Sequence, residues 1–365
     1  MTIYMDRHDV SEAVTAEIVA QIHQEDLKVQ HKYGCRGLTY WFDEVRKTAF
    51  CLIEAPDKNA IIEMHDHAHG EVPHQIIEVD AAIVESFLGR IEDPEKAKNT
   101  ELNIINDPAF RTIMLISQEI LSFQKSNFSY KENWDKQINQ TIKLYEGNIV
   151  RKIKNEYLVS FKSVSKAVLC AVKIAENFNS PESTNINNTF SLKIALNCGI
   201  PVTEKKSIFQ DTIQLAERIK IVSKAKIIVS AEVKELYKSE NKNMFFGNET
   251  VFALSNSEED FIIQLMEFVE KEVQNPQLKV EHFYKNMGLS KSKMYREMIQ
   301  LTGKSPNIFL LEYRLKHSLL LLQNQNTSIS DVAFDCGFNS PSYFTKCFRK
   351  KYGVMPTQYL NFLQS

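Results

Sequence analysis

Two similar segments near the C-terminal end constrain the fold of this chain more than any other feature. They run from Val280 to Gly303 and from Ile329 to Tyr352. Each segment predicts a short helix, a turn that contains a glycine, and a second helix rich in basic residues. This helix-turn-helix pattern occurs twice, and it indicates an all-α domain that binds DNA.

The second unit illustrates the plan. Val332 and Ala333 give its first helix an apolar face, and the small Ala333 allows two helices to approach closely. Gly337 supplies a tight turn, and either Asn339 or Ser340 can cap the helix that follows. The unit is therefore expected to have a core and a turn of its own.

The first unit repeats the plan, with Phe283 and Met287 as core and Gly288 as turn. Between the units, Pro306 opens a helical run whose apolar residues repeat at three and four positions, from Ile308 to Leu322. We expect this run to be a rigid helix that holds the two units at a fixed separation.

The second helix of each unit carries hydroxyl, amide and cationic side chains, which are the groups that contact phosphates and base edges. They predict a surface for double-stranded promoter DNA, and the alternative is a basic face that only meets solvent. The candidate residues are Ser290, Lys291, Ser292, Lys293, Tyr295 and Arg296 in the first unit, and Asn339, Ser340, Ser342, Tyr343, Thr345, Lys346 and Arg349 in the second.

Residues 258–365 resemble the DNA-binding domain of AraC-type transcription regulators. The resemblance implies a sequence-specific regulator that binds an operator and acts on RNA polymerase. Tyr284 departs from the family, which usually has a small alanine there. The matching residues are Gly303-Lys304-Ser305-Pro306, Tyr313-Arg314-Leu315, Ile329, Val332-Ala333, Gly337-Phe338-Asn339-Ser340, Tyr343-Phe344, Phe348-Arg349-Lys350, Gly353 and Pro356.

Charge is divided unevenly along the 365 residues, although the formal net charge is only −2. From Lys279 onward there are 12 Lys and Arg against 5 Asp and Glu, whereas residues 1–100 hold 10 against 19. The acidic end is therefore not expected to meet DNA. Six scattered cysteines, no signal-peptide pattern and no long apolar run predict a cytoplasmic protein without a membrane partner.

Residues 1–80 alternate strand and helix patterns in the order strand, helix, strand, strand, helix, strand. This order predicts a ferredoxin-like α+β domain with one sheet face left to be covered, often by a second copy. The expected strands are Ile3 to Asp9, Gly37 to Asp43, Thr48 to Glu54 and Gln75 to Val79, and the expected helices run from Thr15 to about Lys32 and from Asp57 to about His69.

Histidine is concentrated in this domain, with seven of the nine in the first 74 residues. His65 and His69 lie four apart on one expected helix, so both rings can face one cation. His23 and Asp26 lie three apart on the other helix. Imidazole with carboxylate suits Ni²⁺, Zn²⁺ or Cu²⁺, and the alternative is a solvated helix face.

The same domain resembles a family of small ferredoxin-like proteins described as nickel-binding. The resemblance implies a dimer and a site for nickel or another transition metal, formed through His8, His23, His65 and His69. The matching residues are Met5-Asp6-Arg7-His8, His23, Asp26-Leu27, Gln30, Tyr33-Gly34, Tyr40-Trp41, Asp43-Glu44, Phe50-Cys51-Leu52, Glu54-Ala55-Pro56 and Ala68-His69-Gly70.

Residues 81–109 are polar and weakly periodic, and are expected to form a partly helical linker. Residues 110–255 alternate strands and helices and predict an α/β domain, with a polar excursion from Asn177 to Thr189. This order resembles the class III nucleotide cyclase domain. The matched stretches are Arg151 to Phe161, Ala167, Ala171, Ala175, Ile194 to Gly199 and Leu215 to Arg218.

Departures from that family argue against catalysis. Cyclases hold two divalent ions with two Asp carboxylates, and Ser117 and Asn155 stand where these are expected. Gln214 stands where the family has an Asn that stabilises the transition state, and Arg218 alone among these positions matches the family. The interpretation is a three-domain regulator that is not an enzyme. The alternatives are a cyclase with displaced metal ligands, and a metal-storage protein whose DNA binding is secondary.

Overall fold

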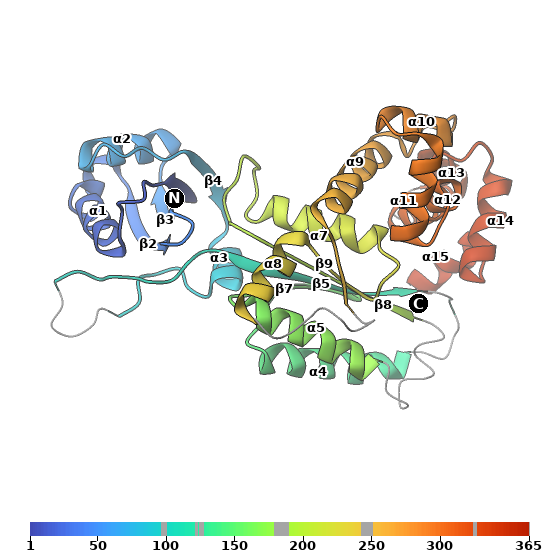
Figure 1. Cartoon of the computed structure of the whole chain (residues 1–365), viewed down its shortest axis with the longest axis horizontal. Helices are drawn as coiled ribbons and strands as arrows, with labels where there is room; N and C mark the ends of the chain where they lie inside the picture. The colour runs from blue at the N-terminus through green and yellow to red at the C-terminus, as the bar shows by residue number, and fades with distance from the viewer. Residues whose placement is uncertain are drawn as a thin grey trace.

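The computed structural model describes residues 1–95, 101–120, 123, 128–178, 190–241, 251–323 and 327–364. Figure 1 shows three bodies in a row, with the sheet of the middle domain between the N-terminal and C-terminal domains. Among the described residues, no helix combines the length and the apolar character needed to span a membrane. The predicted polar excursion lies outside the described residues from position 179 to 189.

The N-terminal domain is a four-stranded antiparallel sheet in the order β2-β3-β1-β4, which confirms the predicted order of elements. One face packs under two helices, which begin at the side-chain caps Thr15 and Asp57. The elements are β1 (Thr2–Asp9), α1 (Ala16–Val29), η1 (Gln30–Tyr33), β2 (Arg36–Asp43), β3 (Thr48–Ala55), α2 (Lys58–Ala68) and β4 (Gln75–Val79).

The second face of this sheet is covered by the same chain. Met5, Trp41 and Phe50 belong to a buried cluster that includes Phe87 of α3 (Ala81–Leu88) and Leu115 of the middle domain. The segment predicted as a linker therefore contains a helix that packs between two domains. A second copy is not needed to cover this face.

The middle domain contains a six-stranded mixed sheet in the order β10-β9-β8-β5-β7-β6. β5, β6, β7 and β8 pair antiparallel, and β8, β9 and β10 pair parallel. The short β10 was not predicted. The elements are β5 (Arg111–Ile120), α4 (Phe128–Leu144), β6 (Asn148–Ile153), β7 (Glu156–Phe161), α5 (Val164–Phe178), β8 (Phe190–Gly199), α7 (Gln210–Val222), β9 (Ile227–Val229), α8 (Ala231–Glu240) and β10 (Val251–Ala253).

The C-terminal domain is all helical, and both predicted helix-turn-helix units are present. The connecting helix α12 contributes Phe309 and Leu310 to the core of the first unit and Leu315 to the core of the second. Ile308, the first residue of the predicted apolar repeat, is exposed on the same helix. The helices are α9 (Asn256–Glu272), α10 (Val280–Asn286), α11 (Lys291–Thr302), α12 (Pro306–Leu321), α13 (Ile329–Asp335), α14 (Pro341–Tyr352) and α15 (Pro356–Gln364).

The two units are joined at the C-terminal end of α9. Arg314 on α12 donates hydrogen bonds to the carbonyl oxygens of Val273 (3.1 Å) and Asn275 (2.6 Å). Gly337, in the turn of the second unit, has φ +75°, and a Cβ there would lie 2.3 Å from the carbonyl oxygen of Val273. Glycine is required because the turn is left-handed and because the backbone of α9 is so close.

We predict that Gly337→Ala destabilises the C-terminal domain by about 2 kcal/mol or more, since both left-handed strain and a backbone clash oppose the methyl group. Gly288→Ala is the matched control. Its φ of +61° is similar, but a Cβ there has no neighbour within 4 Å. Chemical unfolding should show a larger loss for Gly337→Ala, and equal losses would contradict the close packing.

Candidate DNA interface and metal centre

The helices α11 and α14 begin in a way that favours an anion. Ser290 and Ser340 cap them, with side-chain oxygens that accept hydrogen bonds from the amides of Lys293 and Tyr343. No acidic residue lies in the first turn of α11 or α14, whereas α10 and α13 each have one there. Because a helix N-terminus carries partial positive charge, this pattern suits DNA phosphates.

All thirteen residues predicted to contact DNA lie at the surface or are half-buried. Lys291, Lys293 and Arg296 are exposed on α11, and the Tyr343 ring on α14 is 55% exposed. The opposite sides of these helices are buried, with Met294 of α11 in the core of its unit. Each helix therefore presents its polar side outward.

Contacts between the described parts of the middle and C-terminal domains lie away from these N-terminal turns. The carbonyl oxygen of Leu301, at the end of α11, accepts a hydrogen bond from the amide of Lys224 (2.9 Å). Lys316 on α12 pairs with Glu119 of β5. Phe123 packs on the second unit. The C-terminal domain is thus docked on the middle domain through these contacts, and none of the three involves a candidate DNA residue.

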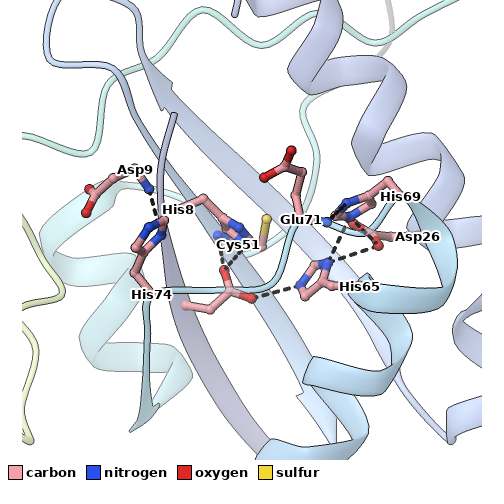
Figure 2. Close-up of polar contacts among 9 residues, drawn as sticks. His8, Asp9, Asp26, Cys51, His65, His69, Glu71 and His74 are labelled. Carbon is pink, nitrogen blue, oxygen red and sulfur yellow. Dashed lines mark hydrogen bonds and ion pairs between the residues drawn. The ribbon is translucent and has the colours of Figure 1, made fainter. Parts of the chain in front are cut away.

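In the N-terminal domain, three potential metal ligands meet where α1 and α2 pack together (Figure 2). Asp26 Oδ1 lies 3.0 Å from His65 Nδ1 and 3.1 Å from His69 Nε2, and the two ring nitrogens are 3.2 Å apart. Donors that are about 2.1 Å from one ion and at right angles to each other lie about 3.0 Å apart. The triangle fits one face of a six-coordinate transition metal ion.

Asp6 supports this group from the sheet. Its Oδ2 is 3.0 Å from Nε2 of His65, so one imidazole joins two carboxylates. Burial alone would lower the pKa of His65, but hydrogen bonds and charges from Asp26 and Asp6 outweigh it and raise that pKa to about 10. A metal bound at Nδ1 would leave Nε2–H to donate to Asp6, as metal-binding histidines commonly do.

The four predicted histidines do not form a single group. His65 and His69 lie together, but the Nε2 of His8 is 3.4 Å from Asp6 Oδ1, on the other side of that carboxylate. His23 lies 3.5 Å from Asp93 and against the ring of Tyr40. Asp6 and Asp26 are not among the predicted ligands, although the spacing of Asp26 from His23 on one helix was a signal in the sequence.

The one arginine matched to the cyclase site is engaged in structural contacts. Arg218 on α7 pairs with Glu267 (3.3 Å) and Glu270 (2.8 Å) of α9. The hydroxyl of Ser117 is buried and has no hydrogen-bond partner among the described residues. The amide of Gln118 bonds the carbonyl oxygen of Asn155. The resemblance of this domain to cyclases stays a prediction.

Comparison with known families supports the two outer domains. Residues 4–79 match a family described as nickel responsive protein SCO4226-like, and residues 284–361 match a family described as a helix-turn-helix domain. Each match covers one domain only, so neither describes the whole chain.

Relatives of the C-terminal domain include several transcription regulators. The chain is 32% identical over 95 residues to the HTH-type transcriptional regulator ExsA of Pseudomonas aeruginosa, which is 26% of this chain and 34% of ExsA. It is 34% identical over 108 residues to histidine kinase P4 of Formosa agariphila, which is 30% of this chain and 8% of that protein. The chain thus spans well under half the length of these relatives.

Solved structures are similar in the same two regions. The DNA-binding domain of AdpA, in complex with a target DNA, is 25% identical and has a TM-score of 0.27, with 28% of this chain and 91% of that chain covered. SCO4226 from Streptomyces coelicolor is 31% identical and has a TM-score of 0.20, with 21% of this chain and 94% of that chain covered.

We predict that the metal-free N-terminal domain loses stability as pH rises from about 7 to about 10. The pKa of His65 is raised in the folded domain. Its contribution to the free energy of unfolding is therefore fully present below the unfolded pKa of about 6.5, and it is lost as the pH rises through the folded pKa of about 10. Hydrogen exchange of α2, corrected for the intrinsic rate, should report this loss. It should be absent in His65→Gln and present in the control His67→Gln.

Proposed function

Since the chain carries an AraC-type helix-turn-helix domain at its C-terminus and an SCO4226-like domain at its N-terminus, we propose that it is a sequence-specific transcription regulator with a transition-metal input. The observation that carries the proposal is the pair of helix-turn-helix units, each with a capped, basic and exposed second helix. The target is double-stranded DNA of a promoter.

DNA recognition follows from the rigid spacing of α11 and α14. Because α12 is part of both cores and Arg314 ties it to the end of α9, the two helices cannot move independently. They would enter two major-groove segments about one helical turn, ~10 bp, apart. In the proposed complex, Lys293 and Arg296 contact the first major-groove segment. Thr345 and Lys346 contact the second.

The metal input resides at Asp26, His65 and His69, with Asp6 as the outer partner of His65. Two imidazoles and a carboxylate suit Ni²⁺ and its neighbours better than Mg²⁺ or Ca²⁺. Neutral His65 is the ligand form, so the ion must displace a proton and binds less tightly as pH falls. Nickel is the first candidate, because the matching family is described as nickel responsive.

A physical route connects this site to the DNA-binding domain. The N-terminal sheet shares a buried cluster with α3 and the middle domain, and the Arg46 guanidinium lies 3.5 Å from the centre of the Phe110 ring. The middle domain in turn shares a buried cluster with α9, α10 and α11. A change at the metal site can therefore shift the position of the DNA-binding domain without a flexible linker.

The two alternatives explain less of the molecule. A cyclase would need carboxylates at Ser117 and Asn155, and its remaining Arg218 is neutralised here by Glu267 and Glu270. Metal storage alone would not explain why the chain has two helix-turn-helix units with basic, exposed second helices.

We also propose where the protein acts and how it assembles. The protein acts in the cytoplasm, where its cysteines, all free among the described residues, stay reduced. It works as a homodimer that contacts RNA polymerase. Because the second face of the N-terminal sheet is already covered, the dimer uses another surface.

We predict that Lys293→Ala and Arg296→Ala each weaken binding to a duplex selected from random sequence by about 1 to 3 kcal/mol. Lys173→Ala on α5 is the control, since that lysine is also exposed but lies on the middle domain. Fluorescence anisotropy over a range of salt concentrations measures both effects. If the intact chain selects no sequence at any salt concentration, the proposed function is wrong.

A second prediction concerns metal affinity. Asp26→Asn and His69→Ala should each weaken Ni²⁺ binding at least tenfold, because each removes one corner of the ligand triangle. The control is His67→Ala on the same helix, since His67 is hydrogen-bonded to Tyr33 outside the triangle. Calorimetry on untagged, metal-free protein measures the affinities. Equal affinities for Ni²⁺ in all three variants would show that Asp26 and His69 do not bind the metal.

A further inference from the structure

A second group of potential ligands lies beside the first, on the sheet. In β1, Asp6 and His8 are two residues apart, so both side chains point to the helix-covered face. The register between β1 and β3 pairs Met5 with Leu52 and His8 with Ala49, which brings Asp6 next to Cys51. The amide of Cys51 donates a 2.9 Å hydrogen bond to Asp6 Oδ1.

Potential ligand atoms of Asp6, His8 and Cys51 all lie within 4.8 Å of one another. Figure 2 shows the sulfur of Cys51 beside the ring of His8. All three residues are buried. The cluster therefore combines an oxygen, a nitrogen and a sulfur donor inside the domain.

The ring of His8 is incompletely satisfied. Its Nε2 is buried and has no hydrogen-bond partner in the described part of the chain, and it lies 3.4 Å from Asp6 Oδ1. Buried polar atoms in folded proteins are normally paired. An ion held between His8, Asp6 and Cys51 would give this nitrogen a partner.

We propose that Asp6, His8 and Cys51 form a second transition-metal site, which makes the N-terminal domain a two-metal centre. This inference rests on the proposed metal-binding function of the domain but uses a separate set of ligands. On binding, the Cys51 thiol releases its proton to solvent and the thiolate becomes a ligand.

The donor set decides which ions the site accepts. Thiolate and imidazole select borderline and soft ions such as Zn²⁺ and Ni²⁺, and disfavour Mg²⁺ and Ca²⁺. The first site has no sulfur ligand, so the two sites differ in their preference. The two sites are linked because Asp6 also accepts a hydrogen bond from His65, which is a ligand of the first site.

Cobalt distinguishes the two sites, because a cysteine thiolate bound to Co²⁺ gives a charge-transfer absorption in the near ultraviolet and imidazole or carboxylate does not. The experiment titrates reduced, untagged, metal-free protein with Co²⁺ under nitrogen and follows stoichiometry by equilibrium dialysis. We expect two Co²⁺ per chain together with the charge-transfer band.

Four variants separate the sites. Cys51→Ser and Cys51→Ala should lose the band and retain one ion. Cys35→Ser is the matched control, since Cys35 is a buried thiol of the same domain, outside the cluster, and this variant should keep the band and both ions. His69→Ala should lose one ion and keep the band.

The outcomes are distinct for each hypothesis. No thiolate band in the wild-type chain, or a band that persists in both Cys51 variants, would overturn the second site. That result in the wild-type chain does not depend on whether a variant folds. If instead His69→Ala retains two ions and the band depends on Cys51, the second site stands and the first proposed site is wrong.

Discussion

The packing of α9 between the middle domain and the DNA-binding units is the constraint on which the rest of the structure depends. Its buried residues, among them Leu265 and Met266, share a core with the middle domain and with the first helix-turn-helix unit. Arg218 pairs with two of its glutamates. At its C-terminal end, Val273 receives Arg314 and the turn at Gly337. One helix therefore positions both units and joins them to the remainder of the chain.

A second constraint lies in the N-terminal domain, where a buried imidazole is shared by two carboxylates. Without metal, the proton on His65 offsets part of the charge of Asp6 and Asp26, and together with His8 and His69 it lowers the pKa values of both carboxyls, although burial alone would raise them. A divalent ion can replace that proton and add one positive charge in a dry environment. Because Asp26 lies on α1 and His65 on α2, we expect such a change to act on the packing of these two helices, which is the type of local event that biases a larger two-state motion.

Much of the fold could be predicted because its signals are local. The expected start of the first strand at Ile3 and the expected helix starts at Thr15 and Asp57 lie within one residue of the observed starts, although α1 ends at Val29, before the expected Lys32. The spacing of His65 and His69 predicted that their rings would meet, and the two ring nitrogens are 3.2 Å apart. The approach of Asp26 could not be predicted, because it depends on how α1 packs against α2. The burial of α3 and the pairing of the three-residue β10 depend likewise on distant parts of the chain.

In the proposed function, metal in the N-terminal domain changes the DNA affinity of the C-terminal domain. The most direct measurement is the affinity of the intact, untagged chain for a selected operator, first metal-free and then with Ni²⁺ at a concentration that calorimetry shows to be saturating. We predict a change of tenfold or more, which corresponds to about 1.4 kcal/mol of coupling between the sites. Identical affinities with the metal site filled would contradict it.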